Sequence, residues 1–164
     1  MTDVKTGYAA PAAPGRTEFA KTRIVLIATR WNVEIVDALL AGARRTLAAW
    51  GVASKHVTEL RAPGAYELPL ACELAARSRK FQGIVALGAV IRGDTPHFDY
   101  VAGECARGLQ DVTLRSRIPV GFGVLTVDTV TQARERAGPG TDNKGAEAAA
   151  AVLEMIRLDA SLRG

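Results

Sequence analysis

Five consecutive residues, Gly93-Asp94-Thr95-Pro96-His97, have the composition of an anion-binding loop that ends in a proton carrier. They lie between an apolar run that predicts a strand and a periodic pattern that predicts a helix, so unpaired backbone N–H groups and the positive end of a helix dipole are expected there. Thr95 adds a hydroxyl donor, and histidine is the side chain whose charge changes near neutral pH. The segment favours an anion beside a general acid or base. A structural interpretation stays open, in which Thr95 caps the helix and His97 packs on its first turn.

Other side chains suited to ligand binding each have a structural alternative as well. Trp31, next to Asn32, offers a flat ring for stacking on a heterocycle, or it covers the start of a helix. Glu67, after a Pro-Gly turn, is suited to accept hydrogen bonds from ligand hydroxyls, or it complements a helix dipole. Arg136 and Lys144 are remote cations near a glycine-rich loop, where a single surface arginine is usually a solvated charge.

Incomplete motifs exclude several other chemistries. Segment 138–144 superficially resembles a phosphate-cradling nucleotide loop, but Asn143 stands where that motif has glycine and Gly145 where it has Ser or Thr. Gly121-Phe122-Gly123 lies inside a predicted strand and is no dinucleotide fingerprint, so Phe122 is expected to pack or to face a neighbouring chain. The sequence also lacks metal-ligand clusters, a glycosidase-like carboxylate pair and a nucleophile elbow.

Alternating hydrophobic periods predict the α/β elements that must position these residues. Short apolar runs indicate strands at 23–28, 54–60, 83–90 and 120–127, with His56 facing solvent. Helical stripes indicate helices near 36–50, 68–75, 101–112, 130–137 and 144–162. Right-handed crossovers then give a four-stranded parallel sheet with helices on both faces, a three-layer sandwich of the flavodoxin-like type. Ligands of such sheets bind beyond the carboxyl ends of the strands, which selects the loops beginning at Thr29, Arg61, Val90 and Thr126.

Length and composition indicate one folded unit. The 164 residues, of which 48% are hydrophobic and 23% charged, suit a single domain at 21–164 after a flexible Ala/Pro/Gly-rich arm at 1–20. No apolar run reaches the about 20 residues of a bilayer span and no secretory signal is evident, so we expect a cytoplasmic protein without membrane contact. A net charge of +4 from scattered arginines, with few aromatic residues, favours a small anionic ligand over nucleic acid. Cys72 and Cys105 are expected to be buried free thiols.

Several segments taken together closely resemble lumazine synthase, the 6,7-dimethyl-8-ribityllumazine synthase family. They are WN at 31–32, PGAYELP at 63–69, GAVIRGDTPHFDYV at 88–101, PVGFGVLT at 119–126, RAG at 136–138 and NKG at 143–145. The resemblance covers nearly everything from Arg23 to the end of the sequence, and segment 88–101 is its most specific part. It does not extend to the first twenty residues.

The resemblance implies a transferase of riboflavin biosynthesis. It would condense 5-amino-6-(D-ribitylamino)uracil with 3,4-dihydroxy-2-butanone 4-phosphate to 6,7-dimethyl-8-ribityllumazine, release phosphate and water, and need no metal or redox cofactor. It assigns proton transfer to His97 and substrate binding to Trp31, Asn32, Ala65, Tyr66, Glu67, Ala89, Val90, Ile91, Asp94, Thr95, Phe122, Arg136 and Lys144. Trp31 would stack on the pyrimidine, Glu67 would take ribityl hydroxyls, and the phosphate would rest on the Asp94-Thr95 segment and Arg136.

The resemblance also implies a homo-oligomer. In the family each site lies at a subunit interface of a five-membered ring, with Phe122, Arg136 and Lys144 supplied by the neighbour, and the short loop before Lys144 permits a sixty-subunit shell. Trp31 stands where the family usually has phenylalanine, which leaves open a flavin-binding or storage protein with weak or no synthase activity. A purely structural ring or shell is a third interpretation, but it gives no reason for a histidine, a threonine and an arginine at one anion site.

Overall fold

Four parallel strands form one sheet at the centre of the molecule, and the computed structural model describes residues 9–15, 17–140 and 142–164. The strands are β1 (Ile24–Thr29), β2 (Val57–Ala62), β3 (Gly83–Ile91) and β4 (Val120–Val127). They lie in the order β2-β1-β3-β4. The chain therefore moves outward in one direction from β1 to β2 and in the other from β3 to β4. The change of direction places the topological switch point between β1 and β3.

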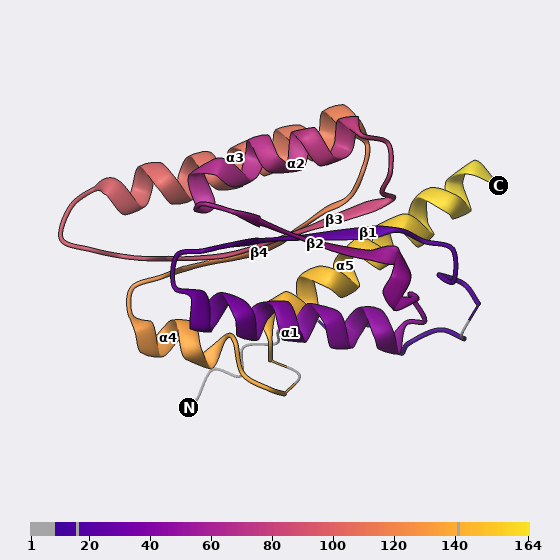
Figure 1. Ribbon diagram of the computed structural model, residues 1–164, viewed down its shortest axis with the longest axis horizontal. Helices are drawn as coiled ribbons and strands as arrows, with labels where there is room; N and C mark the ends of the chain where they lie inside the picture. Colours follow the sequence, from indigo (N-terminus) through magenta and orange to yellow (C-terminus); the bar gives the residue numbers. More distant parts are fainter. Residues whose placement is uncertain (1–8, 16, 141) are drawn as a thin grey trace.

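Helices cover both faces of the sheet and make the three layers seen in Figure 1. One outer layer contains α2 (Leu68–Arg77) and α3 (His97–Ser116). The other contains α1 (Val33–Ala49), α4 (Val130–Glu135) and α5 (Lys144–Arg163). Two 3-10 turns, η1 (Ser54–His56) and η2 (Ala65–Glu67), precede β2 and α2. The predicted four-stranded parallel sheet with helices on both faces is confirmed.

The inner and edge strands differ in how clearly the sequence predicts them. Every residue of β1 is buried, as its continuous apolar run indicates, whereas four consecutive residues of β2 are exposed. The limits predicted for this edge strand are wrong: residues 54–56 form η1, and the strand continues to Ala62 because residues 57–62 pair in register with β1. His56 does not face solvent freely, since it is half-buried and its Nδ1 lies 3.1 Å from the Ala20 carbonyl oxygen.

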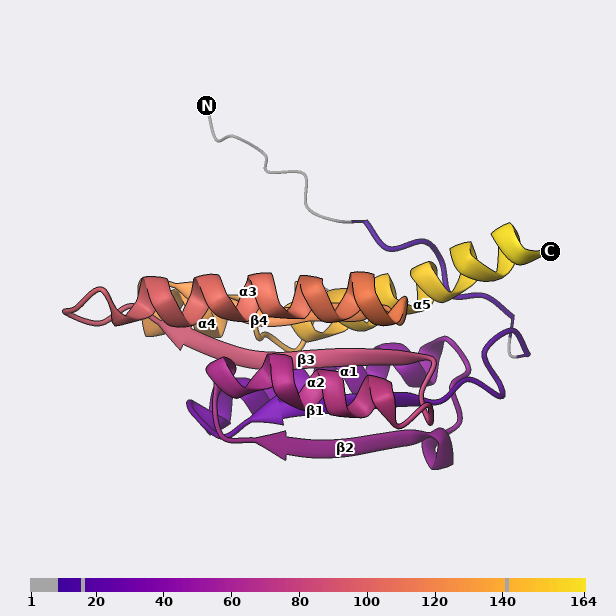
Figure 2. The same cartoon turned by 90° about the horizontal axis from the view of Figure 1, so that it is seen from above.

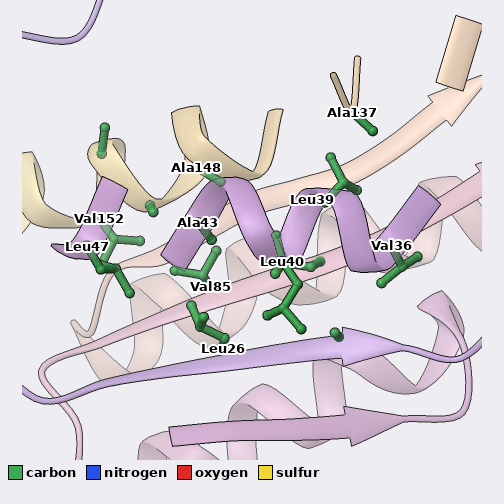
Figure 3. Packing of buried hydrophobic residues seen from close by; sticks show 14 of the residues in the cluster. Leu26, Val36, Leu39, Leu40, Ala43, Leu47, Val85, Ala137, Ala148 and Val152 are labelled. Atoms are coloured by element: carbon green, nitrogen blue, oxygen red, sulfur yellow. The ribbon is translucent and has the colours of Figure 1, made fainter. Parts of the chain in front are cut away.

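The larger hydrophobic core fills the space between the sheet and the layer of α1 and α5. Figure 3 shows side chains that meet there, among them Leu26, Leu40, Leu47, Val85 and Val152. The two helices approach closely at glycines, because a Cβ on Gly42 would overlap the Asn143 side chain and one on Gly145 would overlap the Leu39 carbonyl. Truncation of the fully buried Leu39 to alanine would cost about 2–5 kcal/mol. This packing fixes the start of α5, and hence Lys144, against α1.

The smaller core lies between the sheet and the layer of α2 and α3, and it contains both cysteines. Cys72 and Cys105 are buried and free, as predicted. Desolvation raises the pKa of Cys72 to about 12 and that of Cys105 to about 11. Both thiols are therefore protonated at neutral pH, which makes them poor nucleophiles.

The segment that leads into β1 is attached to the ends of α1 and α5. Phe19 is 2% exposed, and its ring lies 5.8 Å from that of Trp50. Arg157 of α5 forms an ion pair with Glu18 at 2.7 Å and lies over both rings. Of the predicted arm at 1–20, residues 1–8 and 16 lie outside the described residues. In the part of the chain that is described, no helix is both long and apolar enough to span a bilayer.

Candidate active site

The loops that follow β1, β2 and β3 meet at the carboxyl edge of the sheet, around the switch point. Asn32 crosses this point, since its Nδ2 donates a hydrogen bond to the Ala89 carbonyl oxygen of β3 at 3.3 Å. Its backbone is left-handed, with φ at 56°, a conformation that asparagine tolerates better than most residues. The backbone N–H of Arg30 donates to the Ala62 carbonyl at 3.2 Å and ties the same loop to β2. The predicted binding residue Asn32 thus ties the loop after β1 to the end of β3.

Trp31 presents an open aromatic face beside the turn after β2. Its side chain is 73% exposed, although such a large ring is usually well buried. A Cβ on Gly64 would lie 3.0 Å from Trp31 Cδ1 and 3.3 Å from a carboxylate oxygen of Glu67, so the ring and the carboxylate border the same backbone. This arrangement can stack on a flat heterocycle and accept hydrogen bonds from hydroxyl groups attached to it.

Backbone groups of η2 and of the end of β3 lie at the same edge. Ala65, Tyr66 and Glu67 form η2 at the start of α2, with Ala65 buried and Tyr66 exposed. The last three residues of β3 are Ala89, Val90 and Ile91. They pair in register with the last three residues of β4. The structure therefore brings these predicted residues to the edge that carries Trp31.

The loop between β3 and α3 projects beyond the rest of this edge, as Figures 1 and 2 show. Asp94, Thr95 and His97 are all exposed in it. The Thr95 hydroxyl oxygen accepts a hydrogen bond from the backbone N–H of His97 at 3.4 Å, and His97 is the first residue of α3. The imidazole is thus open to solvent at a helix N-terminus, where the dipole and unpaired N–H groups favour an anion.

A second group of predicted residues lies on the open edge of β4. This group comprises Phe122, Arg136 and Lys144. Together with Thr126 and Glu147, they line a groove of about 330 Å³. Phe122 is 49% exposed, so this large ring does not serve the core of its own chain. The groove contains no residue of the loops after β1, β2 and β3.

Arg136 and Lys144 are held by neighbouring backbone and side-chain groups. Helix α4 ends at Glu135, two residues earlier than predicted, and Arg136 is its C-cap. The Nη1 of Arg136 donates a hydrogen bond to the Gln132 carbonyl at 3.0 Å. The backbone N–H of Lys144 donates to the Arg136 carbonyl at 2.9 Å, and its Nζ lies 2.8 Å from a carboxylate oxygen of Glu147. The two cations therefore belong to one connected turn, where they can bind a phosphate or polarise a carbonyl.

Asn143 is a positioning residue, a role that neither the incomplete nucleotide-loop motif nor the family resemblance assigns to it. It is fully buried, and its Nδ2 donates to the carbonyls of Ala38 at 3.0 Å and Gly138 at 2.9 Å. Its Oδ1 accepts a hydrogen bond from the Ala146 N–H at 3.0 Å, which caps α5. Asparagine before a helix start is a recognisable N-cap signal and could have identified it. Through these bonds Asn143 fixes the position of Lys144.

The two groups of residues lie in different layers of one chain. His97 begins α3 on one face of the sheet, whereas Arg136 and Lys144 belong to α4 and α5 on the other face (Figure 1). We call the first group the loop half-site, comprising residues 31–32, 64–67 and 89–97. We call the second the groove half-site, comprising Phe122, Thr126, Arg136, Lys144 and Glu147. The two half-sites adjoin at the strands, where Val90 pairs with Thr126, but His97 and the two cations follow helices on opposite faces of the sheet.

Comparison with models of protein families gives an independent view of the chain. The model described as 6,7-dimethyl-8-ribityllumazine synthase matches residues 21–160. The matched segment contains every residue of the loop half-site and of the groove half-site. Within the described ranges, no three His, Cys, Asp or Glu side chains gather closely enough to hold a metal ion.

Proposed function

The chain belongs to the 6,7-dimethyl-8-ribityllumazine synthase family, and from that membership we propose that it catalyses the formation of 6,7-dimethyl-8-ribityllumazine. The proposed substrates are 5-amino-6-(D-ribitylamino)uracil and 3,4-dihydroxy-2-butanone 4-phosphate, and the reaction releases phosphate and water. The observation that carries the proposal is the pair of half-sites. One offers an aromatic face, a carboxylate, an anion loop and a histidine, and the other offers two cations. A condensation between a planar amine and a phosphoester needs this set of groups.

In the proposed complex the pyrimidine stacks on the open face of Trp31. Its edge hydrogen-bonds to backbone groups at positions 65, 66 and 89–91. Glu67 accepts hydrogen bonds from the ribityl hydroxyls, and its proximity to the Trp31 ring supports this role. Asn32 contributes by keeping the loop of Trp31 at a fixed spacing from β3, through its bond to Ala89.

The phosphate group of the second substrate binds, in this proposal, between the loop half-site and the groove half-site. The Asp94-Thr95 segment supplies backbone N–H groups and a hydroxyl, and Arg136 supplies a planar guanidinium suited to phosphate. Lys144 faces the pyrimidine carbonyl oxygen, and its contact with Glu147 limits its motion. Phe122 forms the apolar wall beside these charges.

His97 is the group proposed to move protons during the reaction. The substrate amine adds to the ketone and water leaves, which gives an imine. Removal of the neighbouring proton then expels phosphate, the resulting enol tautomerises to a carbonyl, and the second amine closes the ring with loss of water. Positioning of the two substrates can contribute about 7–11 kcal/mol, and general acid–base help from histidine about 10²–10⁴-fold.

A complete site requires two copies of the chain in this proposal. His97 begins α3 and Arg136 follows α4, two helices on opposite faces of the sheet, and Phe122 is exposed on the open edge of β4. Phe122 also lines a neighbouring apolar groove of about 680 Å³ between α3 and α5, with the exposed side chains Leu114, Met155, Leu158 and Leu162. We assign the groove half-site to an adjacent subunit in a closed ring, five-membered as in the family, which can assemble further into a sixty-subunit shell.

The proposed enzyme is a cytoplasmic transferase whose partners are its two substrates and further copies of itself. Its reaction involves no net oxidation or reduction. The proposal therefore includes no redox cofactor, and it assigns the proton transfers to the chain's own side chains and the substrates, with no role for a metal ion.

The proposal is tested by incubating the purified protein with both substrates and following lumazine absorbance and inorganic phosphate in the same sample. We expect equal amounts of lumazine and phosphate, formed well above the uncatalysed rate. Arg134→Ala, on the exposed side of α4 and outside the groove, is expected to match the wild type. Lumazine formation no faster than the uncatalysed rate would contradict the proposal. Tight quenching of tryptophan fluorescence by riboflavin would then support the flavin-binding alternative.

A further inference from the structure

A charged cluster lies at the base of the loop that spans residues 93–97. Arg92 is the first residue after β3, and its Nε donates to a carboxylate oxygen of Asp128, just beyond β4, at 3.0 Å. Its Nη1 donates to Asp99, in the first turn of α3, at 3.4 Å. The guanidinium carbon also lies 4.2 Å from the centroid of the Phe98 ring. One side chain thus joins β3, β4 and α3 where the loop leaves the domain and re-enters it.

Both carboxylates are attached to fixed backbone. The Asp128 N–H donates to the Gln132 side chain at 2.7 Å, within the capping box that starts α4. The Asp99 N–H donates to the Pro96 carbonyl at 3.0 Å, and the charge of Asp99 suits the positive end of the α3 dipole. The loop itself is exposed and projects from the edge (Figure 2), so its orientation depends on its base.

We propose that Arg92 is a positioning residue, which with Asp99 and Asp128 holds loop 93–97 so that the Asp94-Thr95 backbone and His97 face the phosphate of the substrate. This inference rests on the proposed function and adds to it a residue that touches neither substrate. The guanidinium is already shared between two carboxylates, which lowers its attraction for a further anion. Lysine is not an equivalent, because an ammonium group lacks the planar fork that bridges two acids.

Steady-state kinetics of Arg92→Gln, Arg92→Lys and Asp128→Asn test the proposal. We expect the KM for the phosphate-bearing substrate to rise by about 3- to 10-fold in Arg92→Gln, which loses two exposed ion pairs, and by about 2- to 5-fold in Asp128→Asn and Arg92→Lys, which each lose one. The KM for the pyrimidine is expected to stay unchanged. The matched control is Arg77→Gln, which removes an exposed arginine paired with Glu73 at 3.1 Å at the opposite edge of the sheet. If Arg92 bound the phosphate directly, Asp128→Asn would free its guanidinium and lower that KM. A lowered KM in Asp128→Asn, or full rescue by Arg92→Lys, would overturn the proposal.

A second measurement does not depend on activity. Hydrogen exchange of the amides of residues 95 and 97–99 is expected to be about 3- to 10-fold faster in Arg92→Gln than in the wild type, and unchanged elsewhere. Unchanged exchange in that segment overturns the proposal whatever the kinetics show. The two proposals can fail separately. If the wild-type protein makes no lumazine, the proposed function is refuted, but faster exchange in Arg92→Gln would still support the role of Arg92 in holding the loop.

Discussion

The loop half-site and the groove half-site are built in different ways. The loop half-site consists of an open ring, backbone groups and exposed side chains on short loops. Hydrogen bonds to neighbouring strands hold these loops in place, such as that from Asn32 to Ala89 of β3 at 3.3 Å. The groove half-site consists of charged side chains at helix ends, fixed by the fully buried Asn143 and by the capping box of α4. The first is suited to recognise shape and hydrogen-bonding pattern, and the second to neutralise charge. In the proposed reaction, each half alone would therefore be an incomplete site, because the two substrates need both kinds of contact.

Replacement of His97 is expected to have the largest effect, because it removes the proposed proton carrier of the loop half-site. His97→Ala should lower kcat by about 10²–10⁴-fold with little change in either KM, and it should leave turnover above the uncatalysed rate because substrate positioning is retained. The matched control is His56→Ala, since His56 is the other histidine of the chain and lies at the amino end of β2. A kcat equal to that of the wild type would show that His97 carries no proton in the slow step.

Replacement of Arg136 tests the groove half-site. Arg136→Ala should raise the KM for the phosphate-bearing substrate by about 10- to 150-fold, because a hydrogen bond to a charged group contributes about 1.5–3 kcal/mol. The KM for the pyrimidine should change much less. Arg134→Ala on the same helix serves as the control. An equal rise of both KM values would contradict a specific contact between Arg136 and the phosphate.

A change beside the Trp31 ring is expected to have a smaller effect, and to raise the KM of the ribityl substrate instead of that of the phosphate-bearing one. Gly64→Ala places a Cβ 3.0 Å from Trp31 Cδ1 and must shift the ring. The KM for the ribityl substrate should rise by about two- to tenfold, since an aromatic contact contributes about 0.5–1.5 kcal/mol, and the KM for the phosphate-bearing substrate should stay constant. Gly103→Ala, on α3 where an added Cβ meets no atom within 4 Å, is the control. If the two KM values rise together, Trp31 does not select the heterocycle.

The fold could be predicted from the sequence wherever burial alone determines an element. The runs that form β1, β3 and β4 are continuously apolar because helices pack against these strands, and this holds even for β4, an edge strand that contacts both α3 and α5. β2 is an edge strand with four exposed residues, so its sequence lacks that pattern and its limits depend on its register with β1. Register is a tertiary property, and the local sequence does not carry it.

Without the family resemblance, the site could be predicted only as a set of loops. Parallel strands end at one edge, so the sequence order already places 29–32, 61–67 and 90–97 near one another. The contacts that hold these loops join residues far apart in sequence, such as Arg92 with Asp128 and Asn143 with Ala38. Such pairs produce no periodic pattern in the local sequence. They depend on the packing of α1 against α5 and of the loop after β3 against β4, which only the folded structure shows.

The central claim is that each active site joins the loop half-site of one chain to the groove half-site of another, and complementation between variants tests it directly. His97→Ala and Arg136→Ala are mixed in equal amounts, unfolded and refolded together, and each is also refolded alone. In a closed ring of randomly mixed subunits, about one quarter of the interfaces combine an intact loop half-site with an intact groove half-site. We predict about one quarter of the wild-type activity, far above that of either variant alone. Activity no higher than the average of the two variants, in particles shown to contain both chains, would contradict the claim.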